Sequence, residues 1–182
     1  MVLKQAKVRG RMLYPGSVVG GLTTIWARSK SHSSGEMVAY FTLDRVYALV
    51  CCRKPSENFV TMGPDKSGKQ NYYERFPDQL KVMYAGREGY LYTPVSEEGL
   101  VRTRGRSFES VTDVPVTLFE HVPDVYAEIL KEERAGGVII HRYAEIDPQE
   151  QRQMTLAILE GWKKGEFAEY SDFVYEHFSP LW

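Results

Sequence analysis

The sequence predicts an α+β protein whose short strands come first and whose helices dominate the last third. Apolar and aromatic runs bounded by Gly and Pro alternate with loops through the first 120 residues or so, and amphipathic helical patterns follow. At 182 residues and 43% hydrophobic side chains, the chain can bury one continuous core. We expect a single domain over residues 1–182, with a mixed or antiparallel sheet and a C-terminal helical part at about 124–178.

The composition excludes several broad classes of protein. The net charge is −1, from 23 basic and 24 acidic residues, so no overall field attracts nucleic acid or an anionic membrane. No apolar run approaches the roughly 20 residues of a membrane-spanning helix. The only cysteines, Cys51 and Cys52, are adjacent, which disfavours a disulfide between them. We therefore expect a soluble cytoplasmic protein with no membrane partner and no strong nucleic-acid signal.

The first 52 residues contain two predicted strands and one predicted helix. Residues 2–14 form a strand that ends at a Pro-Gly turn, and residues 29–36 form a serine-rich polar loop. Residues 37–42 are a short apolar and aromatic strand. Residues 43–52 then change to a helical period, with Thr42 as the expected N-cap.

The middle of the chain is predicted to be mostly loop, with two strands. Residues 55–77 are loop-like, and residues 89–93 form a strand that a turn at 96–99 ends. Residues 114–119 form a second strand. Because Pro115 cannot donate a ladder hydrogen bond, we expect it at a sheet edge or near the strand's start.

The last third is predicted to alternate helices with one strand. A helix runs from Asp124 to Arg134 and ends at Gly136-Gly137, and residues 138–143 form a strand. Asp147, followed by Pro148 at the first helical position, begins a helix that ends at about Lys164. Aromatic residues at helical spacing over 167–178 predict an amphipathic final helix.

Several local patterns are too incomplete to predict a site. Residues 63–70 resemble a phosphate-binding loop, but Gln70 replaces the magnesium-binding Ser or Thr, so we interpret them as a loop. The basic residues of 102–106 are interpreted as a solvated hairpin tip. The four histidines are far apart in sequence and lack partners at metal-ligand spacing, so no metal site is predicted.

Two segments carry a more informative pattern. Residues 13–17, Leu-Tyr-Pro-Gly-Ser, end an apolar strand, and residues 38–42, Val-Ala-Tyr-Phe-Thr, lead into the helical residues 44–51. The pair resembles ADP-ribosyltransferases of the diphtheria-toxin and poly-ADP-ribose-polymerase type, which have His-Gly-Ser after the first strand and Tyr-Phe before a small-residue helix. Pro15 holds the histidine position here. The resemblance implies an ADP-ribosyltransferase-like split sheet, with NAD as the substrate and a protein as acceptor or partner.

The resemblance also implies which residues would bind NAD. Gly16 would allow close approach of the ligand, and its neighbours Tyr14 and Ser17 would complete a backbone clamp for the nicotinamide amide. Tyr40 and Tyr47 would stack against the nicotinamide ring. Pro15 has no side-chain donor or acceptor for the ribose that the family's histidine contacts, so weakened binding is expected.

A carboxylate near the ribose is the remaining requirement of the family's chemistry. Cleavage of the bond between nicotinamide and ribose develops an oxocarbenium-like cation, which a negative charge stabilises. The candidates are Asp113, which fits best by its position before a strand, Glu109, and Glu120 at that strand's end. Because Asp113 is one methylene shorter than the family's Glu, we expect weak NAD hydrolysis or none.

Two other interpretations remain open at this point. A non-catalytic protein-interaction domain could use the same scaffold, with the aromatic segment 72–76 and the C-terminal helices as its contact surface. Alternatively, the tyrosine motifs could all be core residues of a globular protein. Occupancy of the nucleotide site and the reach of a carboxylate distinguish these hypotheses.

Overall fold

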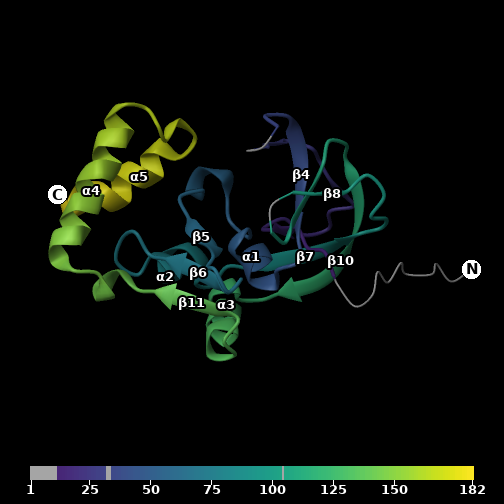
Figure 1. Ribbon diagram of the computed structural model, residues 1–182, viewed down its shortest axis with the longest axis horizontal. Helices are drawn as coiled ribbons and strands as arrows, with labels where there is room; N and C mark the ends of the chain where they lie inside the picture. Colours follow the sequence, from purple (N-terminus) through teal and green to yellow (C-terminus); the bar gives the residue numbers. More distant parts are fainter. Residues whose placement is uncertain (1–11, 32–33, 104) are drawn as a thin grey trace, which may run out of the picture. The chain divides into compact units, whose positions relative to one another are not determined.

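The computed structural model describes residues 12–31, 34–103 and 105–182, and it confirms the α+β class (Figure 1). The chain forms two compact units. Unit 1 comprises Met1–Cys52 and Arg87–Val125, and unit 2 comprises Arg53–Gly86 and Tyr126–Trp182. The single domain over residues 1–182 therefore stays a prediction, and most of the expected strand at 2–14 lies outside the described residues. Within the described part of the chain, no helix is long and apolar enough to cross a membrane.

Unit 1 is built from two four-stranded antiparallel sheets. The first has the order β1-β7-β10-β2, with β1 at Gly16–Ser17, β7 at Gly89–Pro94, β10 at Val114–Val122 and β2 at Thr24–Ile25. The second has the order β3-β4-β9-β8, with β3 at Ser29–Lys30, β4 at Met37–Thr42, β9 at Ser107–Ser110 and β8 at Val101–Arg102. The predicted strands at 37–42, 89–93 and 114–119 are thus confirmed, whereas the polar loop predicted at 29–36 begins with β3.

The two sheets of unit 1 are joined by one isolated antiparallel bridge. Tyr14 N donates to Thr42 O at 2.7 Å, and Thr42 N donates to Tyr14 O at 2.9 Å. No further pairing between β1 and β4 follows among the described residues, and we call the region beside the bridge, where β1 and β4 are unpaired with each other, the split. One core cluster packs residues from both sheets together on a single face: Leu13, Ala39, Phe41, Tyr92, Val114 and Val116.

Helix α1 follows β4 directly and covers Arg45–Val50. Its N-cap is Asp44, whose side chain accepts from Tyr47 N at 3.1 Å. The expectation that Thr42 caps this helix is therefore wrong, because Thr42 lies two residues before the N-cap and its Oγ1 accepts from Asp44 N at 3.0 Å. Val46, Leu49 and Val50 are buried, as the helical period predicted.

Unit 2 contains a three-stranded mixed sheet in the order β11-β6-β5. β5 covers Thr61–Pro64, β6 covers Gln70–Tyr73 and β11 covers Val138–His141, with β11 parallel to β6. The loop predicted over 55–77 is wrong at the short 3-10 helix Pro55–Glu57 and at the two strands of the β5–β6 hairpin, and it is confirmed at the turn between those strands. The residues that resemble a phosphate-binding loop form the hairpin turn, where Asp65 Oδ1 accepts from Ser67 N and Lys69 N.

Helices make up the rest of unit 2. They are α2 at Gln79–Tyr84, α3 at Val125–Arg134, α4 at Pro148–Lys163 and α5 at Ser171–Phe178, with 3-10 turns at Tyr143–Glu145, Ala168–Tyr170 and Ser179–Leu181. The predicted caps at Asp147 and Gly136 are confirmed. Asp147 accepts from the N–H groups of Gln149 and Glu150, and Gly136, at φ 78°, ends α3 in a Schellman motif with Gly137 N donating to Glu132 O.

An aromatic cluster holds α4 and α5 together, and the two helices lie side by side in Figure 1. Phe76, Val174 and Phe178 are buried at its centre, with the rings of Phe59 and Phe173 packed against them. Tyr72 is also fully buried. Two of the three aromatic residues in the segment 72–76 are therefore core residues, so this segment does not form the exposed contact surface that a protein-interaction domain would need.

Candidate functional site

Three of the residues that sequence analysis selected belong to neighbouring strands of unit 1. The bridge between Tyr14 and Thr42 brings β1 to β4: Gly16 lies two residues after Tyr14, and Tyr40 lies two residues before Thr42. Tyr40 in turn pairs with Glu109 of β9. We call Gly16, Tyr40 and Glu109 the site row: Tyr40 and Glu109 are paired neighbours, and Gly16 lies near them through the bridge.

The site row lies on the face of the sheets that is turned away from the core cluster. Side chains alternate along a strand, and the neighbours Phe41 and Phe108 both pack at the core cluster. Tyr40 and Glu109 must then point to the opposite face. Both are half-buried, as expected for side chains that neither enter the core nor stand in solvent.

Gly16 is required where β1 passes under helix α1. A Cβ on Gly16 would lie 1.8 Å from the carbonyl oxygen of Ala48, so no larger residue fits. The side of Gly16 that would carry a side chain thus faces α1. Sequence analysis attributed this glycine to close approach of a ligand, and the structure adds a packing reason.

The backbone of Gly16 points into the split. Tyr14 bonds to Thr42 of β4, whereas Pro15 O accepts from Tyr92 N of β7 at 3.2 Å. Backbone groups alternate in direction along a strand, so the N–H and C=O of Gly16 point the same way as those of Tyr14. Among the described residues no strand pairs with β1 on that side. One donor and one acceptor are thereby presented side by side.

Tyr40 and Glu109 are close neighbours that adjacent residues hold in place. Because the backbone of Thr42 points to Tyr14, that of Tyr40 points the same way, and its pairing with Glu109 is of the non-hydrogen-bonded kind that brings side chains closest. The Tyr40 hydroxyl donates to Lys30 O at 3.3 Å. Ser31 Oγ donates to Glu109 Oε2 at 2.9 Å.

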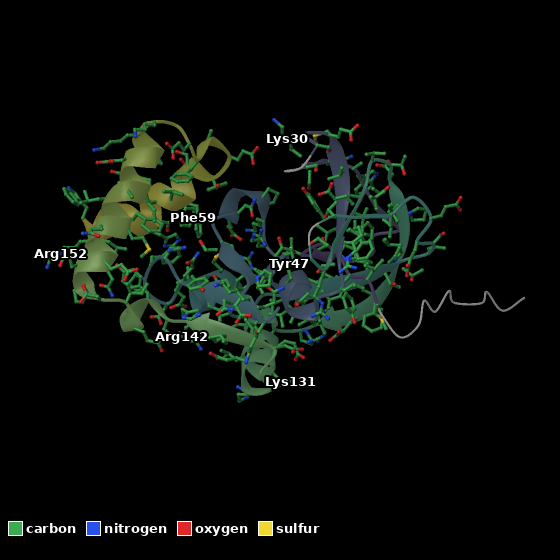
Figure 2. All side chains as sticks on the ribbon, in the orientation of Figure 1. Lys30, Tyr47, Phe59, Lys131, Arg142 and Arg152 are labelled. Carbon is green, nitrogen blue, oxygen red and sulfur yellow. The ribbon has the colours of Figure 1, made fainter. Side chains whose placement is uncertain are left out.

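The other predicted NAD-binding residues differ in their placement. Tyr14 is on the same face as Gly16, with its ring centroid 5.5 Å from that of Phe119. Tyr47, labelled in Figure 2, lies on α1 next to the Ala48 that covers Gly16, and it is 39% exposed. Ser17 points to the other face, and its Oγ accepts from Val19 N at 3.0 Å. Tyr14 and Tyr47 therefore flank the site row, whereas the Ser17 side chain does not.

Of the three candidate carboxylates, Glu109 alone belongs to the site row. Asp113 lies in the turn between β9 and β10, where its Oδ1 accepts from Ala27 N at 2.9 Å. Glu120 accepts from Arg45 at 2.5 and 3.2 Å, an ion pair that ties β10 to α1. Both of these carboxylates thus have structural contacts of their own.

Pro15, at the position of the family's histidine, is buried. It lies one residue from Gly16 in the strand and therefore points to the core side, as Leu13 does. An imidazole at this position would have to lose its hydration without a partner waiting for it. Substituting Pro15 with His is therefore expected to cost stability, and it does not test whether the site binds NAD.

The ionisable residues outside the site row have local roles. The Tyr90 hydroxyl donates to Glu88 at 2.8 Å, a bond that lowers the pKa of the Glu88 carboxyl, and His121 stacks on Tyr90. His141 bonds to Asn71 at 2.8 Å. No three metal-ligating side chains come together among the described residues, a range that leaves out His32.

Sequence analysis missed the two residues that hold the site row. Lys30 and Ser31 were included in the polar loop at 29–36, and a serine-rich loop carries no signal that distinguishes a buried hydroxyl from a solvated one. Their role depends on β3 pairing with the start of β4, where Lys30 lies opposite Met37. The pairing of two strands depends on the tertiary structure and cannot be read from the local sequence.

Comparisons of this chain with protein-family models, with curated proteins and with solved structures found no match. Its function is therefore inferred from the geometry of unit 1 and the chemistry of its residues.

Proposed function

We propose that unit 1 is an ADP-ribosyltransferase-like domain that binds NAD at the split. The observation that carries this proposal is the site row, in which Tyr40 pairs with Glu109 and the Tyr14–Thr42 bridge brings the strand of Gly16 to that of Tyr40. The sequence pattern that suggested the family did not include this alignment. The division of the sheet into two parts joined by one bridge also agrees with the split sheet of the family.

Each member of the site row matches one need of nicotinamide chemistry. A carboxamide has one acceptor oxygen and a donor NH₂ group, and the backbone N–H and C=O of Gly16 would pair with both. The Tyr40 ring would stack on the nicotinamide. The Glu109 carboxylate would stabilise the positive charge that develops on the ribose as the glycosidic bond breaks.

Glu109 is the better candidate for the catalytic carboxylate, in preference to Asp113. It has the full length of the family's Glu and lies beside Tyr40, whereas Asp113 is one methylene shorter and bonds to Ala27. The absence of a histidine at Pro15 removes one ribose contact, so affinity is expected to be modest. The rate of NAD hydrolysis would then be limited by weak NAD binding and not by a carboxylate too short to approach the ribose.

A titration of the protein with NAD, followed by measurement of NAD hydrolysis, tests the proposal. We expect binding at millimolar NAD, and slow release of nicotinamide that Glu109→Gln abolishes and Asp113→Asn leaves in place. Glu98→Gln, on an exposed turn, is the matched control. Absence of both heat and thermal shift with millimolar NAD would refute the proposal, and so would turnover that survives Glu109→Gln.

A further inference from the structure

Glu109 is held by a buried hydroxyl from Ser31, the residue that follows β3. Ser31 is 3% exposed, and its Oγ donates to Glu109 Oε2 at 2.9 Å. Among the described residues, Oε1 of the same carboxylate has no recorded partner. A single contact therefore fixes the orientation of the carboxylate and leaves its second oxygen available.

The Ser31 hydroxyl itself has little freedom. Ser31 N donates to Glu36 O at 2.7 Å, and Ser31 O accepts from Gly35 N at 3.0 Å, so the backbone of Ser31 is tied on both sides. Its Oγ also accepts from Ser34 N at 3.3 Å. A hydroxyl that accepts this N–H directs its own hydrogen elsewhere, and Ser31 Oγ donates to Glu109 Oε2.

The residue before Ser31 acts on the other polar member of the site row. Lys30 O accepts from the Tyr40 hydroxyl at 3.3 Å, and the pairing of β3 with β4 sets the position of Lys30. Adjacent residues at the end of one strand thus hold the ring and the carboxylate together. The distance between the Tyr40 ring and the Glu109 carboxylate is therefore set by one backbone segment, Lys30 and Ser31.

We infer that Ser31 is a positioning residue, which orients Glu109 so that Oε1 faces the reacting ribose. This inference rests on the proposed function. Its physical basis is that a carboxylate rotates about its own side chain unless a hydrogen bond fixes it, and a displacement of about 1 Å can cost 100-fold in rate. Ser31 would not touch NAD, so its loss should lower kcat and leave NAD binding unchanged.

The experiment compares Ser31→Ala with Ser34→Ala, which removes a hydroxyl from the same loop without touching Glu109. We expect Ser31→Ala to lower kcat for NAD hydrolysis roughly 10- to 100-fold, with the Kd for NAD within about twofold of wild type. Ser34→Ala should keep the wild-type kcat.

A second pair of variants keeps the test valid if Ser31→Ala does not fold. Thr and Val have nearly the same shape and differ in the hydroxyl, so Ser31→Thr should retain more activity than Ser31→Val. Equal activity in this pair, or wild-type kcat in a folded Ser31→Ala, overturns the role of Ser31 alone. Absence of NAD binding and turnover in the wild type overturns the proposed function, and the role of Ser31 with it.

Discussion

The two units of this protein use their polar side chains in opposite ways. In unit 2, Glu74 is 4% exposed, and both its oxygens accept backbone N–H groups, Oε1 from Leu80 and Oε2 from Tyr143, each at 3.0 Å. In unit 1, Glu109 is half-buried and has one recorded contact, with Ser31. Both oxygens of Glu74 stabilise the fold, whereas Glu109 is oriented by one hydrogen bond and retains an oxygen for a ligand.

This difference separates a structural polar group from a candidate functional one. Burial alone would have selected Glu74, because a buried carboxylate is unusual. The count of satisfied acceptors reverses that choice, since a carboxylate with both oxygens engaged by the backbone has no capacity left for a substrate. The same reasoning places Gln79 of unit 2 among the structural groups: it accepts from Arg75 N and donates to Phe59 O.

The largest expected effect is on stability, and it comes from adding a methyl group to a glycine in a crowded position. Gly16→Ala places a Cβ 1.8 Å from the Ala48 carbonyl oxygen, and backbone cannot yield as a side chain can. We expect it to lower the free energy of unfolding by at least about 4 kcal/mol, as measured by chemical denaturation. Gly63→Ala in unit 2 is the control, because nothing lies within 4 Å of its added Cβ. Similar stability in both variants would contradict the packing of β1 under α1.

The two carboxylates should respond differently to truncation. Glu74→Ala leaves the N–H groups of Leu80 and Tyr143 buried without an acceptor, so we expect a loss of about 3 kcal/mol in the free energy of unfolding. Glu109→Ala removes one hydrogen bond and should cost less than about 1 kcal/mol. Urea denaturation of both variants measures the difference. A larger loss in Glu109→Ala would make Glu109 the structural carboxylate.

Tyr40 and Tyr73 provide a matched comparison of aromatic residues for ligand binding. If Tyr40 stacks on nicotinamide, Tyr40→Ala should weaken NAD binding by about 1–3 kcal/mol, a typical span for the loss of a stacking platform. Tyr73, a half-exposed tyrosine of unit 2 that stacks on His141, should have no effect when changed to Ala. Calorimetric titration measures both. Equal losses would indicate that the effect comes from general destabilisation.

The smallest effect concerns pH and unit 2. Burial lowers the pKa of His177, whose ring stacks on Phe76 at 4.4 Å, while Glu176 opposes the shift. The unfolded chain then binds a proton more readily than the folded one, so stability is complete above the ordinary histidine pKa of about 6.5 and declines as the pH falls below it. Thermal melts of wild type and His177→Phe from pH 7.5 to 5 should diverge, with the wild type losing more on acidification. Parallel pH profiles would contradict the shift.

The sequence predicted best those elements whose signals are local. Asp147 with Pro148 identified the start of α4, Gly136 identified the end of α3, and the aromatic run at 37–42 identified β4. Each of these depends on a cap or on a pattern within a few residues. Physical chemistry acting over one or two turns is enough to specify them.

The β5–β6 hairpin escaped prediction because its residues break the usual alternation. Gly63 and Pro64 interrupt β5, and β6 begins with the polar residues Gln70 and Asn71, which are nevertheless buried. Their burial depends on partners elsewhere in the chain, such as His141 for Asn71. Hydropathy read along the sequence cannot include those partners.

The candidate site was predicted in its parts and not in its arrangement. Gly16, Tyr40 and Glu109 were each selected from local patterns, but Asp113 was preferred to Glu109 because position along the chain was the only measure available. The register that pairs Tyr40 with Glu109 joins residues 69 apart in sequence. Such a pairing is set by the core on the other face, to which neighbouring residues of both strands contribute.

Among the described residues, the bridge between Tyr14 and Thr42 is the point at which hydrogen bonds join the two sheets of unit 1. Two hydrogen bonds fix this point, and the core cluster packs residues of both sheets together. Phe41 on β4 and Tyr92 on β7 belong to this cluster, one from each sheet. Because this cluster lies on the face opposite the site row, we expect a smaller side chain at Phe41 to shift the site row although Phe41 would not touch a ligand there.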